Sequence, residues 1–335
     1  MQGNLISIVM PVKNASSYLS DCLESILLQS EKNWELLAVD DGSDDNSFEI
    51  LSTFSERDVR IHCFKNDGDG IISSLQKAYS KSKGEFIHRM DADDLMPKNK
   101  LSLLKKVLTN AGKGHVATGK VNYFSSEGIS EGYFKYQEWL NGLIDSETHW
   151  EELFKECVIA SPAWMIHRSD FDLVGAFNST IYPEDYDLVF RFFEHNIKVV
   201  ACKEIIHLWR DHAARTSRNH IHYQQNSFLE LKLHYFLKLI AKPNKQIVLW
   251  GAGRKGKIMA KLLKEQNKTF EWVSDNPNKI GQDIYKQVMQ SYEKIVTQKN
   301  PQIIITVAQR NAKNEIITFL SKQGLVEGVN FWFFC

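Results

Sequence analysis

The sequence carries no net charge. Lys and Arg together number 41, and so do Asp and Glu. A chain with no overall field of either sign is not expected to bind nucleic acid or an acidic membrane through charge alone. An anionic partner must therefore be recognised at a local site.

Paired cysteines, long apolar runs and repeats are also missing. The five cysteines are scattered and form no C-x-x-C, which is typical of a reducing compartment without disulfides. No apolar run reaches the roughly 18–20 residues that span a bilayer. The opening run "LISIVMPV" lacks the basic residues of a signal peptide. We expect a cytoplasmic protein, with peripheral association at the cytoplasmic face of the membrane as an option.

The first hundred residues alternate between strand and helix patterns. Four apolar runs have the character of strands covered on both faces. These runs are 5–11, 34–40, 59–64 and 85–90. An apolar stripe at helical spacing follows the first run, with Ser16 or Ser17 as its cap. The alternation predicts a parallel sheet wrapped by helices.

A second domain is expected after a helical linker. The length of 335 residues favours two domains. Residues 221–243 contain one amphipathic helical pattern that ends at a proline, and strand–turn–helix alternation then restarts. We therefore expect a first domain over 1–220, a linker over 221–243 and a small α/β domain over 244–335.

Polar side chains gather where three of the predicted strands end. Lys13 and Asn14 follow the first strand, a pair of aspartates follows the second, and "DADD" follows the fourth. In open α/β sheets, ligands bind at the carboxyl ends of the strands. Carboxylates there can hold a hard cation, which would neutralise a diphosphate. Asp94, the last residue of "DADD", is expected to cap the next helix or to be solvated.

The stretch "SIVMPVKNASSYLSDCLESILLQSEKNWELLAVDDGSDDNS", followed by "GEFIHRMDADD", resembles family 2 of the glycosyltransferases, which has the GT-A fold. The resemblance implies that Asp91, Ala92 and Asp93 form the family's D-x-D motif. Asp93 and Asp91 would then bind Mn²⁺ or Mg²⁺, which in turn binds the diphosphate of a nucleotide-sugar donor. The residues that the resemblance assigns to nucleotide-sugar binding are Pro11, Val12, Asn14, Asp41, Asp91, Ala92 and Arg210.

The segment "IHRSDFDLVGAFNSTIYPEDYDLVFRF" is similar to the acceptor side of the same family. The match implies that Asp185 is the general base, with Glu184 as its neighbour. The base would take the proton of the acceptor hydroxyl as its oxygen attacks the anomeric carbon. The segment "HLWRDHAARTSR" resembles the family's lid, where Arg210 would pair with the diphosphate and His212 would contact the metal or the diphosphate.

Each of these motifs also has a structural alternative. Asp41 could cap a helix through its turn, and "PEDYD" could be an acidic helix N-terminus that contains Glu184 and Asp185. His212 could be a buried histidine with a satisfied hydrogen bond. The other histidines near it fit no standard zinc spacing.

The run "GAGRKG" places Gly251, Gly253 and Gly256 in the pattern G-x-G-x-x-G between a predicted strand and helix. Asp275 ends the next predicted strand. Glycines allow close backbone approach, and a helix N-terminus favours a phosphate. The domain resembles small Rossmann-like modules attached to sugar-processing enzymes. Three roles stay open: a structural or docking module, a nucleotide or nucleotide-sugar site, and an NAD(P) site.

The sequence thus predicts an α/β protein with a GT-A nucleotide-diphospho-sugar transferase fold and a small Rossmann-like α/β domain. We expect an inverting, metal-dependent glycosyltransferase that moves a sugar from a nucleoside-diphosphate sugar to a glycan or lipid-linked acceptor in cell-surface polysaccharide synthesis. The alternatives are an NAD(P)-dependent oxidoreductase that acts through the C-terminal domain and a non-catalytic sugar-nucleotide sensor.

Overall fold

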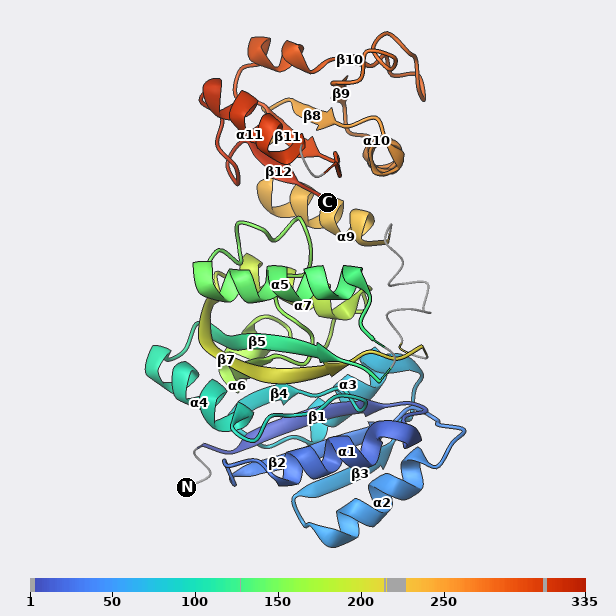
Figure 1. The fold of residues 1–335 in the computed structure, drawn as a ribbon, viewed down its shortest axis with the longest axis vertical. Coiled ribbons are helices and arrows are strands. Elements are labelled where there is room, and N and C mark those ends of the chain that lie inside the picture. Colours follow the sequence, from blue (N-terminus) through green and yellow to red (C-terminus); the bar gives the residue numbers. More distant parts are fainter. Residues whose placement is uncertain (1–3, 127, 214, 216–226, 310–311) are drawn as a thin grey trace. The chain divides into compact units, whose positions relative to one another are not determined.

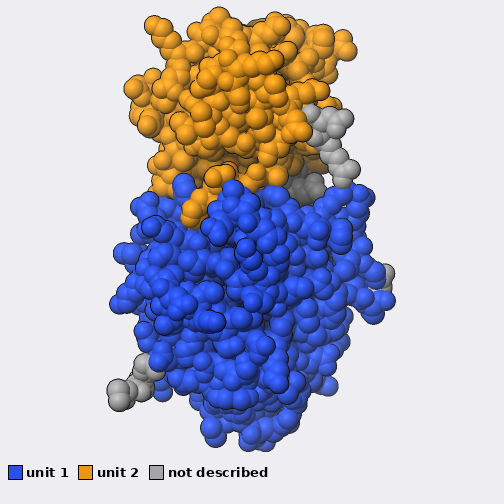
Figure 2. Space-filling model, turned by 60° about the vertical axis from the view of Figure 1, so that its left-hand side comes forward, with its two compact units in different colours: residues 1–149, 158–215 blue, residues 150–157, 216–335 orange. Residues whose placement is uncertain are grey.

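Two compact units make up the chain (Figure 2). The computed structural model describes residues 4–126, 128–213, 215, 227–309 and 312–335. Unit 1 comprises residues 1–149 and 158–215, and unit 2 comprises residues 150–157 and 216–335. The segment 150–157, which the sequence pattern puts in the first domain, therefore belongs with the C-terminal part of the chain.

Unit 1 is built on a mixed sheet of seven strands in the order β3-β2-β1-β4-β6-β5-β7 (Figure 1). The strands are β1 (Ile6–Val12), β2 (Trp34–Asp40), β3 (Ile61–Lys65), β4 (Phe86–Arg89), β5 (His115–Phe124), β6 (Trp164–His167) and β7 (Lys198–Arg210). Only β6 runs antiparallel to its neighbours. The strands expected over the first hundred residues are confirmed. All seven residues of β2 are buried, whereas β3, at the edge of the sheet, is partly exposed.

Seven helices complete the described part of unit 1. They are α1 (Ser16–Leu27), α2 (Ser47–Arg57), α3 (Gly70–Lys81), α4 (Lys100–Ala111), α5 (Glu131–Ser146), α6 (Arg168–Leu173) and α7 (Glu184–Glu194). Helix α3 packs on β1 and β2, whereas α4 packs on β5, β6 and β7. Helices therefore pack against the sheet, and loops continue from the ends of its strands.

The start of α1 is held by side chains from a distant loop. The expected cap by Ser16 or Ser17 is wrong, because Ala15 is the N-cap residue and no side chain within the helix caps it. Instead, the backbone N–H of Ser16 donates to Asp45 Oδ2 at 3.0 Å, and that of Ala15 donates to Ser47 Oγ at 2.9 Å. These bonds satisfy donors that a helix end leaves open.

Unit 2 contains a parallel sheet in the order β10-β9-β8-β11-β12 (Figure 1). Its strands are β8 (Ile247–Trp250), β9 (Phe270–Ser274), β10 (Gln290–Ser291), β11 (Gln302–Ile305) and β12 (Phe331–Phe333). Its helices are α9 (Ser227–Tyr235), a π-helical turn (Phe236–Ile240), α10 (Arg254–Glu265), a 3-10 helix (Tyr292–Thr297) and α11 (Ala312–Lys322). The apolar tail "FWFF" contains the last strand, β12.

The helix expected as a linker over 221–243 is part of unit 2 from residue 227 on, while residues 221–226 lie outside the described residues. Helix α9 packs on α10. Lys232 of α9 is buried and donates from Nζ to the carbonyl oxygen of Lys155 at 2.7 Å. Phe154 stacks on Phe334 with their ring centroids 5.3 Å apart. The segment 150–157 is thus built into the core of unit 2.

Two glycines of the run "GAGRKG" are required by packing. Gly251 has φ of +133°, and a side chain there would lie 2.5 Å from Thr306 Oγ1. A Cβ on Gly256 would overlap the carbonyl oxygen of Gly251. A Cβ on Gly253 would meet no atom within 4 Å. Close packing between the strand end and α10 therefore accounts for Gly251 and Gly256 without a ligand.

None of the helices in the described ranges combines the length and apolar character that crossing a bilayer requires. All five cysteines lie in those ranges, and each is a free thiol.

We expect Gly256→Ala to lower the free energy of unfolding of unit 2 by about 1–3 kcal/mol, because the added methyl group meets rigid backbone. Chemical denaturation followed by tryptophan fluorescence measures the loss. The matched control is Gly253→Ala, which should lose less than about 1 kcal/mol because its Cβ enters open space. Equal losses in the two variants would contradict the packing role.

Candidate active site

The carboxyl ends of β1, β2 and β4 meet at one edge of the sheet in unit 1. Val12 lies opposite Asp40, and Val9 lies opposite Arg89. The backbone N–H of Asp41 donates to the carbonyl oxygen of Val12 at 2.8 Å. The parallel register thereby brings two groups of residues from the sequence analysis to the same edge. The first group is Pro11, Val12, Asn14 and Asp41, and the second is Asp91, Ala92 and Asp93.

The carboxylate of Asp41 is buried and already holds the start of helix α3. It accepts hydrogen bonds from the backbone N–H of Gly70 at 3.0 Å and from Asn66 Nδ2 at 2.6 Å. Lys13 Nζ lies 3.4 Å from its second oxygen. The alternative that Asp41 caps the next helix through its own turn is wrong, because α2 begins after Asn46 without a side-chain cap and Asp41 instead accepts from the first residue of α3.

The loop after β4 is joined to the end of β7. Leu95 and Leu208 exchange backbone hydrogen bonds at 3.0 and 3.1 Å. Arg210 donates from Nε to the carbonyl oxygen of Asp93 at 2.8 Å. Its guanidinium also lies over the rings of Tyr18 and Phe124, at 4.9 and 4.7 Å from their centroids. Arg210 is thus fixed beside the aspartates of the D-x-D sequence.

Asp93 and His212 provide ligand atoms that suit a divalent cation. His212 Nε2 lies 2.9 Å from Asp93 Oδ2, close to the roughly 3 Å that separates adjacent ligands about 2.1 Å from an octahedral metal ion. Burial raises the pKa of Asp93, but the hydrogen bond from His212 and the nearby guanidinium of Arg215 outweigh it. The pKa of Asp93 is therefore below its ordinary value, and the side chain is a carboxylate.

The protein alone offers few ligands at this point. Across the part of the chain that the structure describes, no three His, Cys, Asp or Glu side chains are grouped to hold a metal ion. One carboxylate and one imidazole would leave most of the coordination shell of a divalent cation such as Mn²⁺ to water and substrate phosphates. Asp91 is less suited to this role, because Oδ1 of Asp91 is bonded to Arg89.

Asp94 is buried, so the expectation of a solvated or helix-capping carboxylate is wrong. Only 1% of the residue is exposed, and the N-cap of α4 is Asn99. Asp94 Oδ2 lies 3.0 Å from His207 Nε2, and Asp94 Oδ1 accepts from the backbone N–H of Arg210 at 2.8 Å. Burial and the neighbouring Asp93 raise the pKa of Asp94 well above its ordinary value.

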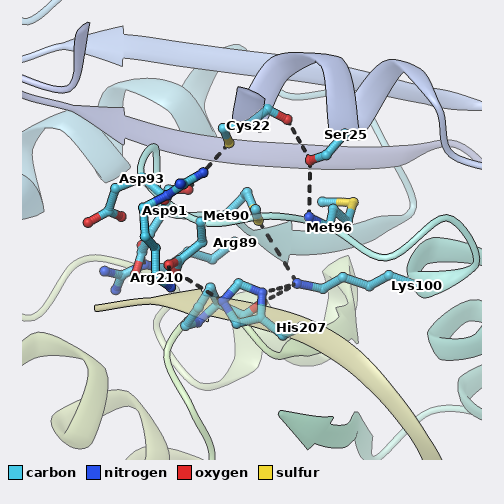
Figure 3. Close-up of polar contacts among 12 residues, drawn as sticks. Cys22, Ser25, Arg89, Met90, Asp91, Asp93, Met96, Lys100, His207 and Arg210 are labelled. Atoms are coloured by element: carbon cyan, nitrogen blue, oxygen red, sulfur yellow. Dashed lines mark hydrogen bonds and ion pairs between the residues drawn. The ribbon is translucent and has the colours of Figure 1, made fainter. Parts of the chain in front are cut away.

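A buried lysine completes this chain of polar contacts (Figure 3). Lys100 Nζ lies 3.0 Å from His207 Nδ1 and donates to the carbonyl oxygen of Pro162 at 2.6 Å. When Lys100 is protonated, its ammonium only donates, so Nδ1 of His207 accepts and Nε2 carries the proton that His207 shares with Asp94. Burial lowers the pKa of Lys100 to about 7. The contacts from Lys100 through His207 to Asp94 link α4, β7 and the loop after β4.

Glu184 and Asp185 are the first two residues of α7, where the helix dipole favours negative charge. Burial, followed by the neighbouring carboxylate of Glu184, raises the pKa of Asp185 to about 7, although Arg89 opposes the shift. Asp185 Oδ1 also accepts from the backbone N–H of Tyr186 at 2.8 Å. A carboxylate with a pKa near neutrality can take up and release protons under ordinary conditions.

Arg89 joins the two acidic groups, and the sequence analysis did not single it out. Arg89 Nε lies 3.0 Å from Asp91 Oδ1, and one of its terminal nitrogens lies 3.1 Å from Glu184 Oε1. The only signal in the sequence is its position, because an arginine that ends a strand covered on both faces must find buried partners. Asp91 of the D-x-D sequence and Glu184 of the Glu–Asp pair are therefore held by one guanidinium.

The loop of glycines in unit 2 borders a separate hollow of about 430 Å³. Its lining residues are Ala252, Gly253, Arg254, Lys257, Ile258, Lys261 and Tyr285. Asp275, which the sequence pattern groups with these glycines as a possible nucleotide site, does not belong to this lining and is exposed. Gly251 and Gly256 face Thr306 and each other rather than the hollow.

Comparison with known families identifies part of the chain. The model of the family described as glycosyl transferase family 2 matches residues 7–174, half of the chain. The glycosyltransferase GlyG of Streptococcus pneumoniae is 35% identical over 127 residues, which cover 38% of this chain and 42% of GlyG. The chain spans 22% of the related pneumococcal glycosyltransferase GlyA.

A longer match is to an Escherichia coli protein named UDP-Glc:alpha-D-GlcNAc-diphosphoundecaprenol beta-1,3-glucosyltransferase WfgD. The two are 28% identical over 242 residues, which cover 69% of this chain and 84% of WfgD.

Solved structures show the fold. Staphylococcus aureus TarS 1–349 in complex with UDP matches with a TM-score of 0.52 and 14% identity, covering 78% of this chain and 71% of TarS 1–349. The mannosyltransferase PcManGT of Pyrobaculum calidifontis, in complex with GDP-Man and Mn²⁺, matches with a TM-score of 0.50 and 13% identity, covering 77% and 69%. The seven-stranded sheet of unit 1 is therefore the expected GT-A arrangement.

The raised pKa of Asp185 makes stability depend on pH in a defined direction. Because its folded-state pKa of about 7 lies above the value of about 3.9 for a free aspartate, the folded protein holds a proton that the unfolded chain releases between these values. The contribution of Asp185 to stability is thus full below about pH 4 and is lost as the pH rises to 7.

We expect Asp185→Asn to raise Tm relative to the unaltered protein, with a gain that grows from pH 4 to pH 8. Thermal unfolding followed by circular dichroism across this range measures the effect. Asp44→Asn removes an exposed carboxylate and serves as the control. A gain that is constant or shrinks with pH for Asp185→Asn would rule out the raised pKa.

Proposed function

The chain belongs to glycosyl transferase family 2, and from this we propose that it is an inverting, metal-dependent glycosyltransferase. In this proposal it moves a sugar from a nucleoside-diphosphate sugar to a glycan or lipid-linked acceptor in cell-surface polysaccharide synthesis. The observation that carries the proposal is the ion-paired link from Asp91 through Arg89 to Glu184, which joins the D-x-D aspartates to the Glu–Asp pair.

Relatives support both substrate classes. TarS is known in complex with UDP and with UDP-GlcNAc, and PcManGT is known in complex with GDP-Man and Mn²⁺. The name of WfgD describes transfer of glucose from UDP-Glc to a sugar on diphosphoundecaprenol. A nucleoside-diphosphate donor and a lipid-linked acceptor are therefore the first candidates for this chain.

The donor is proposed to lie at the ends of β1, β2 and β4. Pro11, Val12, Asn14, Asp41, Asp91 and Ala92 would contact its nucleoside. Asp93 and His212 would hold Mn²⁺ or Mg²⁺ against the diphosphate, and a bound cation would stabilise the charge that builds on the leaving diphosphate. Arg210, whose guanidinium is held next to the backbone of Asp93, would pair with the same phosphates.

The acceptor is proposed to lie at the start of α7. Asp185 would accept the proton of the acceptor hydroxyl while that oxygen attacks the anomeric carbon from the face opposite the diphosphate, which inverts the configuration. The pKa of about 7 suits this task, because the side chain is partly ionised near neutral pH and still has appreciable proton affinity. Glu184, held by Arg89, would keep the first turn of α7 in place.

We also propose a cytoplasmic location with peripheral association at the membrane. The five free thiols suit a reducing compartment. A lipid-linked acceptor would present its sugar at the membrane surface.

The direct test is a panel of nucleoside-diphosphate sugars with Mn²⁺, scored by release of the nucleoside diphosphate. We expect release from one donor. Asp93→Ala should abolish the dependence on Mn²⁺ and lower the rate by about 10²-fold or more, since both cation donors are needed. Asp185→Asn should lower transfer by roughly 10²- to 10⁴-fold while donor binding is retained. Near-normal transfer by Asp185→Asn would contradict its role as the base.

The alternative of an NAD(P)-dependent oxidoreductase in unit 2 is less well supported. Packing accounts for Gly251 and Gly256, and Asp275 is not among the residues that line the adjacent hollow. Thermal shift separates the two hypotheses. We expect UDP or GDP with Mn²⁺ to raise Tm, whereas stabilisation by NAD(P) alone would favour the oxidoreductase. Donor binding without hydrolysis or transfer would indicate a sugar-nucleotide sensor.

A further inference from the structure

Arg89 occupies the last position of β4 and is almost fully enclosed. Its side chain is 5% exposed, although it carries a permanent charge. Figure 3 shows Arg89 close to Asp91 at the end of the strand. A buried guanidinium is tolerated only when carboxylates or other acceptors satisfy it. The identity of those acceptors therefore indicates what the residue does.

Two different nitrogens of Arg89 bind two different carboxylates. Nε pairs with Asp91 at 3.0 Å, and a terminal nitrogen pairs with Glu184 at 3.1 Å. Because the guanidinium is planar and rigid, the separation between its nitrogens cannot change. Arg89 and Glu184, which are 95 positions apart in the sequence, are thereby joined through one inflexible group.

We propose that Arg89 is a positioning residue that sets the distance between the donor side of the site, at Asp91, and the acceptor side, at Glu184 and Asp185. The inference rests on the proposed function, since the two sides have these roles only in glycosyl transfer. Asp185 follows Glu184 directly in α7, so an anchor on Glu184 also fixes the backbone that carries Asp185.

A second arginine shows what a purely structural role looks like. Arg191 is 12% exposed and pairs with Asp187 of the same helix at 2.8 Å. Its terminal nitrogen donates to the carbonyl oxygens of Val174 and Ala176 at 2.6 and 2.8 Å. Arg191 therefore ties α7 to the preceding loop and touches neither the D-x-D aspartates nor Glu184.

The experiment compares Arg89→Met, Arg89→Lys and Arg191→Met in the full chain. The probe is the donor from the panel of UDP-glucose, UDP-GlcNAc and GDP-mannose with Mn²⁺ that the unaltered protein turns over fastest. Release of the nucleoside diphosphate gives kcat and the donor KM, and thermal unfolding gives Tm for each variant.

We expect Arg89→Met to lower kcat about 100-fold while the donor KM changes less than about threefold, since a displacement of about 1 Å at the reacting groups costs this much. Arg89→Lys keeps the charge but one ammonium cannot hold both carboxylates at the same spacing, so kcat should stay at least about tenfold low. Arg191→Met should lower Tm while kcat stays within about threefold.

Three outcomes overturn the inference alone. The first is a kcat of Arg89→Met near that of the unaltered protein, and the second is a donor KM of Arg89→Met that rises as much as its kcat falls. The third is an Arg191→Met variant that has the same Tm as Arg89→Met and loses as much kcat. If Arg89→Met does not fold, Arg89→Lys decides, because a folded lysine variant with normal kcat also overturns it. Absence of release by the unaltered protein from all donors overturns the proposed function and the inference together.

Discussion

Buried charge has to be paired, and this requirement organises unit 1 around the ends of β4 and β7. Removing one member of a buried ion pair leaves an uncompensated charge, which is far more costly than losing an exposed contact. Two chains of paired groups meet this condition here. One runs from Asp91 through Arg89 to Glu184, and the other runs from Lys100 through His207 to Asp94. Each joins segments that are remote in sequence, so the pairing also determines how α4, α7 and β7 approach the loop after β4.

The two chains leave different side chains available for chemistry. Asp94 is bonded to His207 and to the backbone of Arg210, so it is not an uncommitted acceptor. Asp93 has a lowered pKa and is a carboxylate next to His212, whereas the pKa of Asp185 is raised to about 7. This is the separation of proton affinities that a cation-assisted transfer with a carboxylate base needs. The proposed chemistry therefore follows from how the protein distributes partners among six nearby acidic residues.

Unit 2 contains a sequence motif of which packing alone explains two residues. The pattern G-x-G-x-x-G has the strand and helix context of a dinucleotide site, yet two of its glycines are explained by contact with Thr306 and with each other. The same spacing serves close helix–strand packing in many parallel α/β folds, with or without a ligand. The inclusion of residues 150–157 in this unit was not expected either, since nothing local distinguishes that segment from the loops around it.

Strand and helix periods, the order of elements and the acidic groups at strand ends could all be read from the sequence. These features depend on near neighbours in the chain, as the predicted and observed ranges of β1 to β4 illustrate. The partners of Asp94, the helix that Asp41 holds and the role of Arg89 could not be read in this way. Each depends on a contact across 25 to 116 residues, such as that between Asp94 and Arg210. Which buried groups meet is settled only when the strands take their register, because packing and not local pattern supplies each charge with its partner.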